Sequence, residues 1–266
     1  MSKVYGIISI KGGVGKTTTV ANLGASLAND FGKKVLLVDG NFSAPNLGLH
    51  LGIVNPKKHV HGVVHHNHSL TEAVHKHELG FDLLPSSLTS NRGIEPKEFK
   101  GIIKYLKRKY DVILIDSSPS LNHEMIATMM ASDELLVITT PDFPTLSTTM
   151  RAVKIAKQKK TPITGLILNK VRNKKFELSL DDIEDATNTP VLAVLKDDVK
   201  VLESLASSVP LTVYSPRRKV ATSYKKLAAS LINEEYNKEN IFDKIKGLFS
   251  KDFDRDEVNR EILKKR

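Results

Sequence analysis

An apolar, β-branched run near the start of the chain leads directly into a loop rich in glycine and lysine. The run is Val4–Ile10, the loop reads KGGVGKTT over Lys11–Thr18, and helical apolar spacing begins at Val20. A strand that turns through glycines into a helix directs backbone N–H groups and a helix N-terminus at an anion. The Gly-Lys-Thr ending is the P-loop pattern, which binds nucleotide phosphates. The segment therefore predicts a nucleotide site within an α/β fold.

Two side chains of this loop have expected roles in binding the nucleotide. Lys16 is expected to reach the β- and γ-phosphates, and Thr17 to place its hydroxyl on Mg²⁺. The alternative is a glycine-rich strand-to-helix turn without a ligand, and the Gly-Lys-Thr spacing argues against it. The residues of the loop expected to bind ATP are Gly12, Gly13, Val14, Gly15, Lys16, Thr17 and Thr18.

Strand-like runs alternate with helical patterns over most of the chain. One amphipathic segment has Phe99, Ile103 and Leu106 at helical spacing after Pro96, a residue suited to a first helical turn. Continuous apolar strands between such helices indicate a parallel sheet covered on both faces. We therefore expect a doubly wound α/β domain of the P-loop NTPase type over residues 1–233. The further strands are expected at residues 34–39, 81–85, 111–116, 134–140 and 163–169.

Composition restricts the class of protein and its partners. The 266 residues contain no run of 18 or more apolar residues and begin with no secretory signal, so we expect a cytoplasmic protein without a transmembrane helix. Cysteine is absent, which excludes disulfides and thiolate metal sites. The net charge of +10 favours an anionic partner such as nucleic acid, a membrane surface or nucleotide, although a lysine-rich proteome would explain it equally.

The loop carries a second lysine, Lys11, and KGGVGKTT resembles the deviant Walker A motif of the MinD/ParA family. VDGNFSAPNLGLHLG (Val38–Gly52) resembles the switch I region of that family, and LIDSSPSL (Leu114–Leu121) its Walker B and switch II region. GLILNKV (Gly165–Val171) is similar to the strand whose last asparagine contacts adenine. The resemblance covers about residues 1–232 and is closest to archaeal MinD-like proteins.

The resemblance implies a role for single residues. The lysine matching Lys11 reaches across an ATP-dependent homodimer to the nucleotide of the partner subunit, where a cation offsets charge that develops during phosphoryl transfer. Asp116 is expected to orient Mg²⁺ through water, and Asn169 to read the adenine edge. The expected catalytic residues are Lys11, Lys16, Asp39, Asn41 and Asp116.

The switch I region departs from the family pattern. Many relatives carry Asp-x-Asp, whereas this chain has Asp39-Gly40-Asn41. Asn41 can hydrogen-bond a water molecule but cannot take its proton, so we predict slow hydrolysis and a long-lived ATP-bound dimer. The alternatives are that Asn41 is natural to a subfamily, that Asp39 suffices, or that the substitution was made to trap ATP.

A short amphipathic segment, NIFDKIKGLFSKDF, lies near the C-terminus. At about 100° per residue its bulky apolar residues share one face, and Lys244, Lys246 and Lys251 lie mostly away from it. The segment resembles the membrane-targeting helix of MinD proteins. A helix packed on the core, or one that mediates association, is the alternative. We expect a polar linker at residues 234–240, the helix at 241–253 and a charged tail at 254–266, with membrane contact through Ile241, Phe242, Ile245, Leu248 and Phe249.

Seven of the nine histidines lie between His59 and His77. If this stretch is helical at its start, His61 and His65 fall at i, i+4 and form a possible metal-ligand pair. The alternative is a short surface helix that starts near Ser69, with histidines that are solvated and titrate near pH 6.

The resemblance implies an ATPase that dimerises on ATP, is cytoplasmic when free and peripheral to an anionic membrane when ATP-bound, and Asn41 adds the expectation of slow turnover. It would position or recruit other proteins, for example at the cell-division site, with a cargo or activator that the sequence does not reveal. The alternative is a ParA-like partitioning ATPase that binds nucleoid DNA through basic patches at Lys170–Lys175, Arg217–Lys219 and Lys225–Lys226. A third possibility is a nucleotide-dependent scaffold with negligible hydrolysis.

Overall fold

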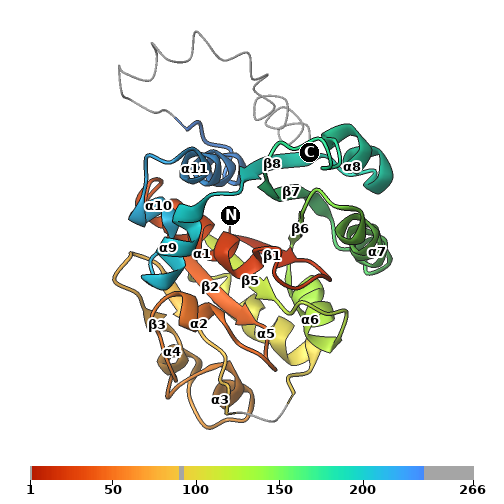
Figure 1. The fold of residues 1–266 in the computed structure, drawn as a ribbon. Coiled ribbons are helices and arrows are strands. Elements are labelled where there is room, and N and C mark those ends of the chain that lie inside the picture. Colours follow the sequence, from red (N-terminus) through yellow and green to blue (C-terminus); the bar gives the residue numbers. More distant parts are fainter. Residues whose placement is uncertain (1, 90–92, 237–266) are drawn as a thin grey trace.

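An eight-stranded sheet runs through the centre of the protein in the computed structural model, which describes residues 2–89 and 93–236 (Figure 1). The strand order is β3-β4-β2-β5-β1-β6-β7-β8, and the β3–β4 pair is the antiparallel one. The predicted doubly wound, mainly parallel sheet is therefore confirmed. The strands are β1 Lys3–Ile8, β2 Val35–Gly40, β3 His75–Lys76, β4 Asp82–Leu84, β5 Val112–Ser117, β6 Glu134–Thr139, β7 Ile163–Val171 and β8 Val191–Lys196.

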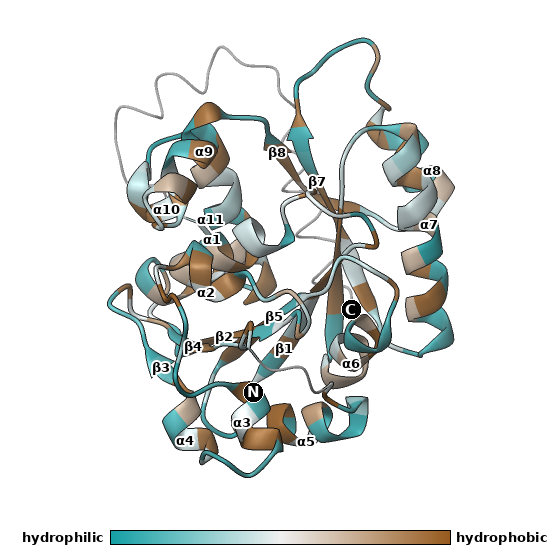
Figure 2. Cartoon of the chain, turned by 60° about the horizontal axis from the view of Figure 1, so that its bottom comes forward, coloured by the Kyte–Doolittle hydropathy of each residue, from teal (hydrophilic) through white to brown (hydrophobic). Residues whose placement is uncertain are grey.

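Helices cover both faces of this sheet (Figure 1). In Figure 2 the strands are largely hydrophobic, and hydrophilic residues lie on the outward sides of the helices. One face is covered by α1 Lys16–Asn29, α2 Leu47–His50, α9 Val199–Ala206, α10 Leu211–Tyr214 and α11 Lys219–Leu231. The other face is covered by α3 Val60–Val64, α4 Leu70–Ala73, α5 Pro96–Leu106, α6 His123–Ala131, α7 Phe143–Gln158 and α8 Leu180–Thr187.

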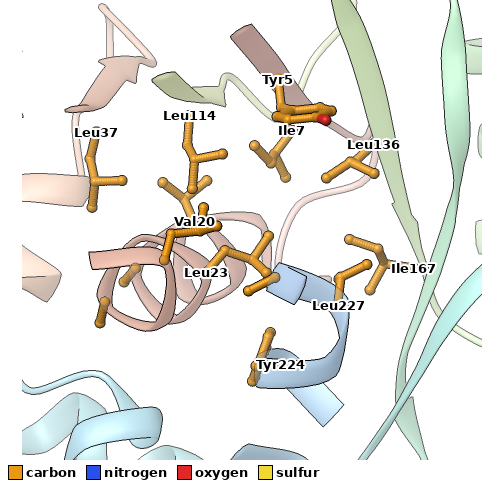
Figure 3. Close-up of a cluster of buried hydrophobic side chains, with 14 of the residues drawn as sticks. Tyr5, Ile7, Val20, Leu23, Leu37, Leu114, Leu136, Ile167, Tyr224 and Leu227 are labelled. Carbon is orange, nitrogen blue, oxygen red and sulfur yellow. The ribbon is translucent and has the colours of Figure 1, made fainter. Parts of the chain in front are cut away.

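Helix α1 is packed on two sides, against the sheet and against α11 (Figure 3). Val20 and Leu23 meet side chains of the central strands, and Tyr224 and Leu227 of α11 close the cluster. All four side chains are at most 2% exposed. This burial fixes the helix that follows the P-loop, and so fixes the position of the loop itself.

Several local predictions are confirmed with small changes at the ends. The helix predicted after Pro96 is α5, with Pro96 in its first turn, and Ser69 caps α4 with a capping box that includes Glu72. The strands predicted at 34–39 and 81–85 are observed as Val35–Gly40 and Asp82–Leu84. Strand β8 was not predicted.

The C-terminal predictions lie outside the described residues. These are the amphipathic helix at 241–253, the tail at 254–266 and all but the first residues of the linker at 234–240. No helix in the described ranges is long and apolar enough to cross a membrane.

Strand β1 lies between β5 and β6 at the centre of the sheet. The chain runs from β1 to β2 on one side and from β6 to β7 and β8 on the other, so the strand order reverses at this position. A crevice at such a switch point, outside the carboxyl ends of the strands, is where open α/β sheets bind ligands. The loop at residues 11–18 leaves β1 at this point.

Candidate nucleotide site

The loop between β1 and α1 has the backbone conformation that a phosphate cradle requires. Gly13 and Gly15 have φ values of 73° and 102°, a region that favours glycine. A side chain at Gly15 would also collide with the amide nitrogen of Asn169. Gly15 is the N-cap of α1 and uses no side-chain cap, which leaves the first N–H groups of the helix for a ligand.

Lys16 lies inside this loop, with only 7% of its surface exposed. Its Nζ is 3.4 Å from the carbonyl oxygen of Lys11. Burial lowers the pKa of Lys16, and the negative charge of Asp116 opposes that effect. A buried ammonium group beside open N–H groups makes this loop complementary to a polyphosphate.

Thr17 and Asp116 come together as the sequence predicted. The Thr17 hydroxyl donates to Asp116 Oδ2 at 2.7 Å, and Asp116 is the second-last residue of the buried strand β5. The other oxygen of Asp116, Oδ1, is buried and has no hydrogen-bond partner among the described residues. Hard cations prefer oxygen ligands, and a hydroxyl beside an unpaired carboxylate oxygen fits Mg²⁺. These two residues would hold the metal directly or through water.

The two switch I residues differ in what they face. Asp39 is fully buried, and its carboxylate accepts hydrogen bonds from the backbone N–H groups of Asn41 and Leu47, each at 3.1 Å. Asp39 therefore holds the loop in place. The amide nitrogen of Asn41 donates to the carbonyl of Ala44, whereas Asn41 Oδ1 is buried without a partner among the described residues. Asn41 lines the nucleotide cavity and leaves this oxygen as an acceptor.

A cavity of about 610 Å³ opens beside the loop. It is lined by Gly12, Lys16 and Thr17 of the P-loop, by Asn41, and by residues of distant elements. Its size suits a bound nucleotide. Lining residues that the sequence did not identify as part of a nucleotide site include Arg172, Lys196, Asp197, Asp198, Val201, Leu202, Leu205 and Tyr224.

The position of Asp197 and Asp198 could have been predicted from the sequence, because the pair directly follows the apolar run of β8 and so lies at the carboxyl edge of the sheet. The position of Tyr224 could not have been predicted, because α11 brings it to the cavity from more than 200 residues away along the chain.

Asn169 lies against the back of the P-loop. Its amide nitrogen donates to the carbonyl of Val14 at 2.7 Å, and its Oδ1 accepts from the backbone N–H of Lys170 at 2.9 Å. The Lys170 ammonium group donates to the carbonyl of Gly13 at 2.7 Å. Strand β7 thus supports the loop through two side chains, and the expected contact of Asn169 with adenine stays a prediction.

Lys11 points away from the phosphate cradle. Its Nζ lies 2.6 Å from the Thr145 hydroxyl and 3.2 Å from Asp142 Oδ1, at the start of α7. The Lys11 side chain is 41% exposed. It lines a second cavity of about 310 Å³, which shares Gly12, Gly13, Lys170 and Arg172 with the nucleotide cavity. Lys11 therefore borders the site without entering it.

The histidine-rich stretch agrees with the sequence expectations only in part, because the short helix expected near Ser69 is present as α4. No group of three or more His, Asp or Glu side chains within the described ranges could hold a metal ion, so the His61–His65 pair gains no further ligands there. The expectation of solvated histidines is wrong for His61, which is 1% exposed and packs edge-on against Phe42 and His59. Burial lowers the pKa of His61 to about 4, so this imidazole is neutral at physiological pH.

The fold and the site together define the class: a P-loop nucleotide-binding protein with its phosphate cradle at the switch point of a parallel sheet. Comparison with known proteins agrees. The AAA domain family matches residues 2–164. An uncharacterized ATP-binding protein of Methanocaldococcus jannaschii is 32% identical, over 91% of this chain and 96% of its own. The septum site-determining protein MinD of Thermotoga maritima is 30% identical, over 94% and 98%.

Solved structures agree with the sequence relatives. The septum site-determining protein MinD of Pyrococcus horikoshii, complexed with Mg-ADP, has a TM-score of 0.82 and 31% identity, and covers 94% of this chain and 100% of its own. A ParA family ATPase of Chlorobium tepidum shares the fold, with a TM-score of 0.77 and 24% identity. This chain belongs to the MinD/ParA family of P-loop ATPases. ATP is therefore the nucleotide that the site binds.

Proposed function

We propose that this protein is a MinD-like ATPase that dimerises on ATP, associates with an anionic membrane and positions or recruits other proteins. The observation that carries the proposal is the position of Lys11. Its ammonium group lies on the outer side of the loop, 41% exposed, and does not enter the nucleotide cavity of its own chain. A cation placed there can act on the nucleotide of a second subunit.

Within one subunit, Lys16 and the loop N–H groups would bind the phosphates, and Thr17 and Asp116 would hold Mg²⁺. Bound Mg²⁺ would offset the negative charge of the phosphate oxygens. Asn41 would orient the attacking water through its unpaired Oδ1. Because an amide cannot take a proton, positioning and charge stabilisation would carry hydrolysis, and turnover would be slow.

The rate proposal is tested by single-turnover hydrolysis of ATP by the native chain and by Asn41→Asp. Restoring a carboxylate should raise the rate by about 10-fold or more, since a positioned base contributes at least that much in most enzymes. Asn41→Ala, which removes the acceptor oxygen, should be slower than both. Equal rates for the native chain and Asn41→Asp would refute the slow-turnover proposal.

The membrane proposal is tested by sedimentation of the full chain with anionic vesicles in ATP or ADP. One short amphipathic helix binds weakly, and a dimer that presents two binds more tightly through effective concentration. Binding should therefore require ATP and should be lost on deletion of residues 240–253. Binding that is equal in ADP, or that survives the deletion, would contradict this coupling.

The DNA-binding alternative is less well supported by the described side chains. Lys225 is 9% exposed and pairs with Asp30 at 2.7 Å, and Arg218 pairs with Asp198 at 2.8 Å. Lys170 and Arg172 are likewise engaged, with the carbonyl of Gly13 and with Asp197, so at least four basic residues of the candidate DNA patches are used within the fold. Salt-sensitive binding to duplex DNA that ignores the deletion of residues 240–253 would favour this alternative.

A further inference from the structure

The edge of the sheet opposite the nucleotide site carries a concentration of basic side chains. In a parallel sheet every helix-to-strand connection reaches the same edge, where the strands begin. Here the connections into β2, β5 and β7, together with the start of β1, are rich in lysine. We name this surface the basic edge, and its residues are Lys3, Lys33, Lys34, Lys107, Arg108, Lys109, Lys157, Lys159 and Lys160.

The connections that carry these residues lie side by side, because backbone hydrogen bonds join their ends in strand order. The Asp111 N–H donates to the carbonyl of Lys34 at 2.8 Å, and the Lys3 N–H donates to the carbonyl of Asp111 at 2.9 Å. On the other side of β1, the Asp133 N–H donates to the carbonyl of Val4 at 2.9 Å. At about 4.8 Å per strand, β2 and β7 begin roughly 20 Å apart.

Most of the basic side chains at the basic edge make no ion pair among the described residues. Three of its lysines pair with carboxylates, and the pairs are Lys3–Glu134, Lys33–Glu234 and Lys107–Asp133. The other six side chains are exposed and have no ion pair among the described residues: Lys34, Arg108, Lys109, Lys157, Lys159 and Lys160. This excess of cations at one edge is available to an external anionic surface.

The chain leaves the folded domain at this same edge. The Tyr5 hydroxyl donates to the carbonyl of Leu231, the last residue of α11, at 2.7 Å. Glu234 then pairs with Lys33 at 2.6 Å. The amphipathic sequence begins at residue 240, six residues after Glu234. Six residues of extended chain span at most about 20 Å.

We infer that the basic edge is a second contact with the anionic membrane, made by the headgroup phosphates while residues 240–253 supply the apolar contact. The inference rests on the proposed membrane association. Surface lysines are attracted to anionic lipid only within about a Debye length. Lysines that assist binding must therefore lie on the side of the domain from which the chain continues to residues 240–253. Nucleic acid would use the same charges, but it would gain nothing from an adjacent segment with an apolar face. The juxtaposition therefore favours lipid.

The test uses the full chain with Lys109→Gln, Lys159→Gln and Lys160→Gln combined. These side chains are exposed and outside the nucleotide site, so ATP hydrolysis without vesicles should match the native chain. Binding to vesicles of phosphatidylglycerol and phosphatidylcholine in ATP should weaken by about 10-fold or more, given the attraction that each lysine adds. The difference should shrink as salt is raised.

A matched control removes three exposed lysines elsewhere, through Lys97→Gln, Lys174→Gln and Lys219→Gln. It has the same net charge as the first triple variant and should bind vesicles nearly as well as the native chain. Equal loss in both variants would attribute the effect to net charge and overturn the inference.

The remaining outcomes separate this inference from the proposed function. If the native chain binds in ATP and the first triple variant binds equally well, the basic edge is not a lipid contact, while the membrane proposal survives. If the native chain does not bind vesicles in ATP, both fail. If the first triple variant loses binding to a DNA duplex but keeps its binding to vesicles, the edge binds nucleic acid and the inference is overturned.

Discussion

Asp39 and Asp116 lie opposite one another on neighbouring strands, in register between β2 and β5. Burial raises the pKa of Asp116 to about 6, and burial together with the charge of Asp116 raises that of Asp39 to about 8. The pKa of Asp39 is raised further than that of Asp116, so Asp116 is the member of the pair that ionises first as the pH rises. The two carboxyl groups also differ in their surroundings: Asp116 lies where a cation fits, and Asp39 accepts the backbone N–H groups that hold the loop.

Affinity for Mg²⁺ should fall as the pH falls through the pKa of Asp116. The ionised form binds the metal. With a pKa of about 6, the ionised fraction of Asp116 falls about 10-fold between pH 7 and pH 5, so Mg²⁺ binding should weaken by about the same factor. The measurement is a Mg²⁺ titration with a fluorescent ATP analogue. Asp116→Asn should bind Mg²⁺ weakly at both pH values and shows how much of the change comes from the nucleotide itself. An equal pH dependence in Asp116→Asn and the native chain would contradict the prediction.

Lys11 must leave Asp142 and Thr145 before it can reach a second subunit. Asp142→Asn removes the negative charge that holds Lys11. The asparagine side chain can still accept the hydrogen bond from the Thr145 N–H, and so can still cap α7. Because an exposed ion pair contributes about 0.2–1 kcal/mol, ATP-dependent self-association should tighten by about two- to fivefold. Analytical ultracentrifugation measures this. Lys11→Ala should abolish the gain, and weaker association of Asp142→Asn would show that Asp142 has another part in the dimer.

The same glycine-to-alanine substitution should have opposite effects in α1 and α5, because Gly24 faces a packed side chain and Gly101 faces open space. A Cβ at Gly24 of α1 would lie 2.5 Å from Leu37 Cδ2, and Leu37 is fully buried. Gly24→Ala should therefore destabilise the protein by about 1–3 kcal/mol through overpacking. Gly101 of α5 is exposed with nothing within 4 Å of that position, so Gly101→Ala should stabilise it by about 0.5–1 kcal/mol. Denaturant unfolding of both variants checks the signs, and a shared sign would contradict the packing described.

The central strands and the P-loop could be predicted from sequence because their signals are local. The first four residues of β5, Val112–Ile115, are all apolar, as is typical of strands buried on both faces. Strand β8 carries a similar run, VLAVLK, and was missed although the signal was present. The partners of Lys11 could not be predicted, because Asp142 and Thr145 are about 130 residues away and meet it only through the strand order.

The same strand order makes nucleotide binding a property of the complete fold. Residues from the P-loop, α1, β5, β7, α9 and α11 line one cavity, so a bound nucleotide links both sides of the sheet switch point. A ligand that binds only the folded state stabilises it in proportion to ln(1 + [L]/Kd). Stabilisation by nucleotide therefore reports on the assembled site, and any further stabilisation by a partner subunit adds to it.

Thermal unfolding should distinguish these two contributions. Mg-ADP at about 100 times its Kd should stabilise the monomer by about 2.7 kcal/mol and raise the Tm by roughly 5–10 °C for a domain of this size, at any protein concentration. Mg-ATP should add a shift that grows with protein concentration, because dimerisation contributes. Lys16→Ala should lose both effects, whereas Lys11→Ala should keep the first and lose the second. An ATP shift that is independent of protein concentration would mean that nucleotide binding stabilises the single chain alone, with no dimer involved.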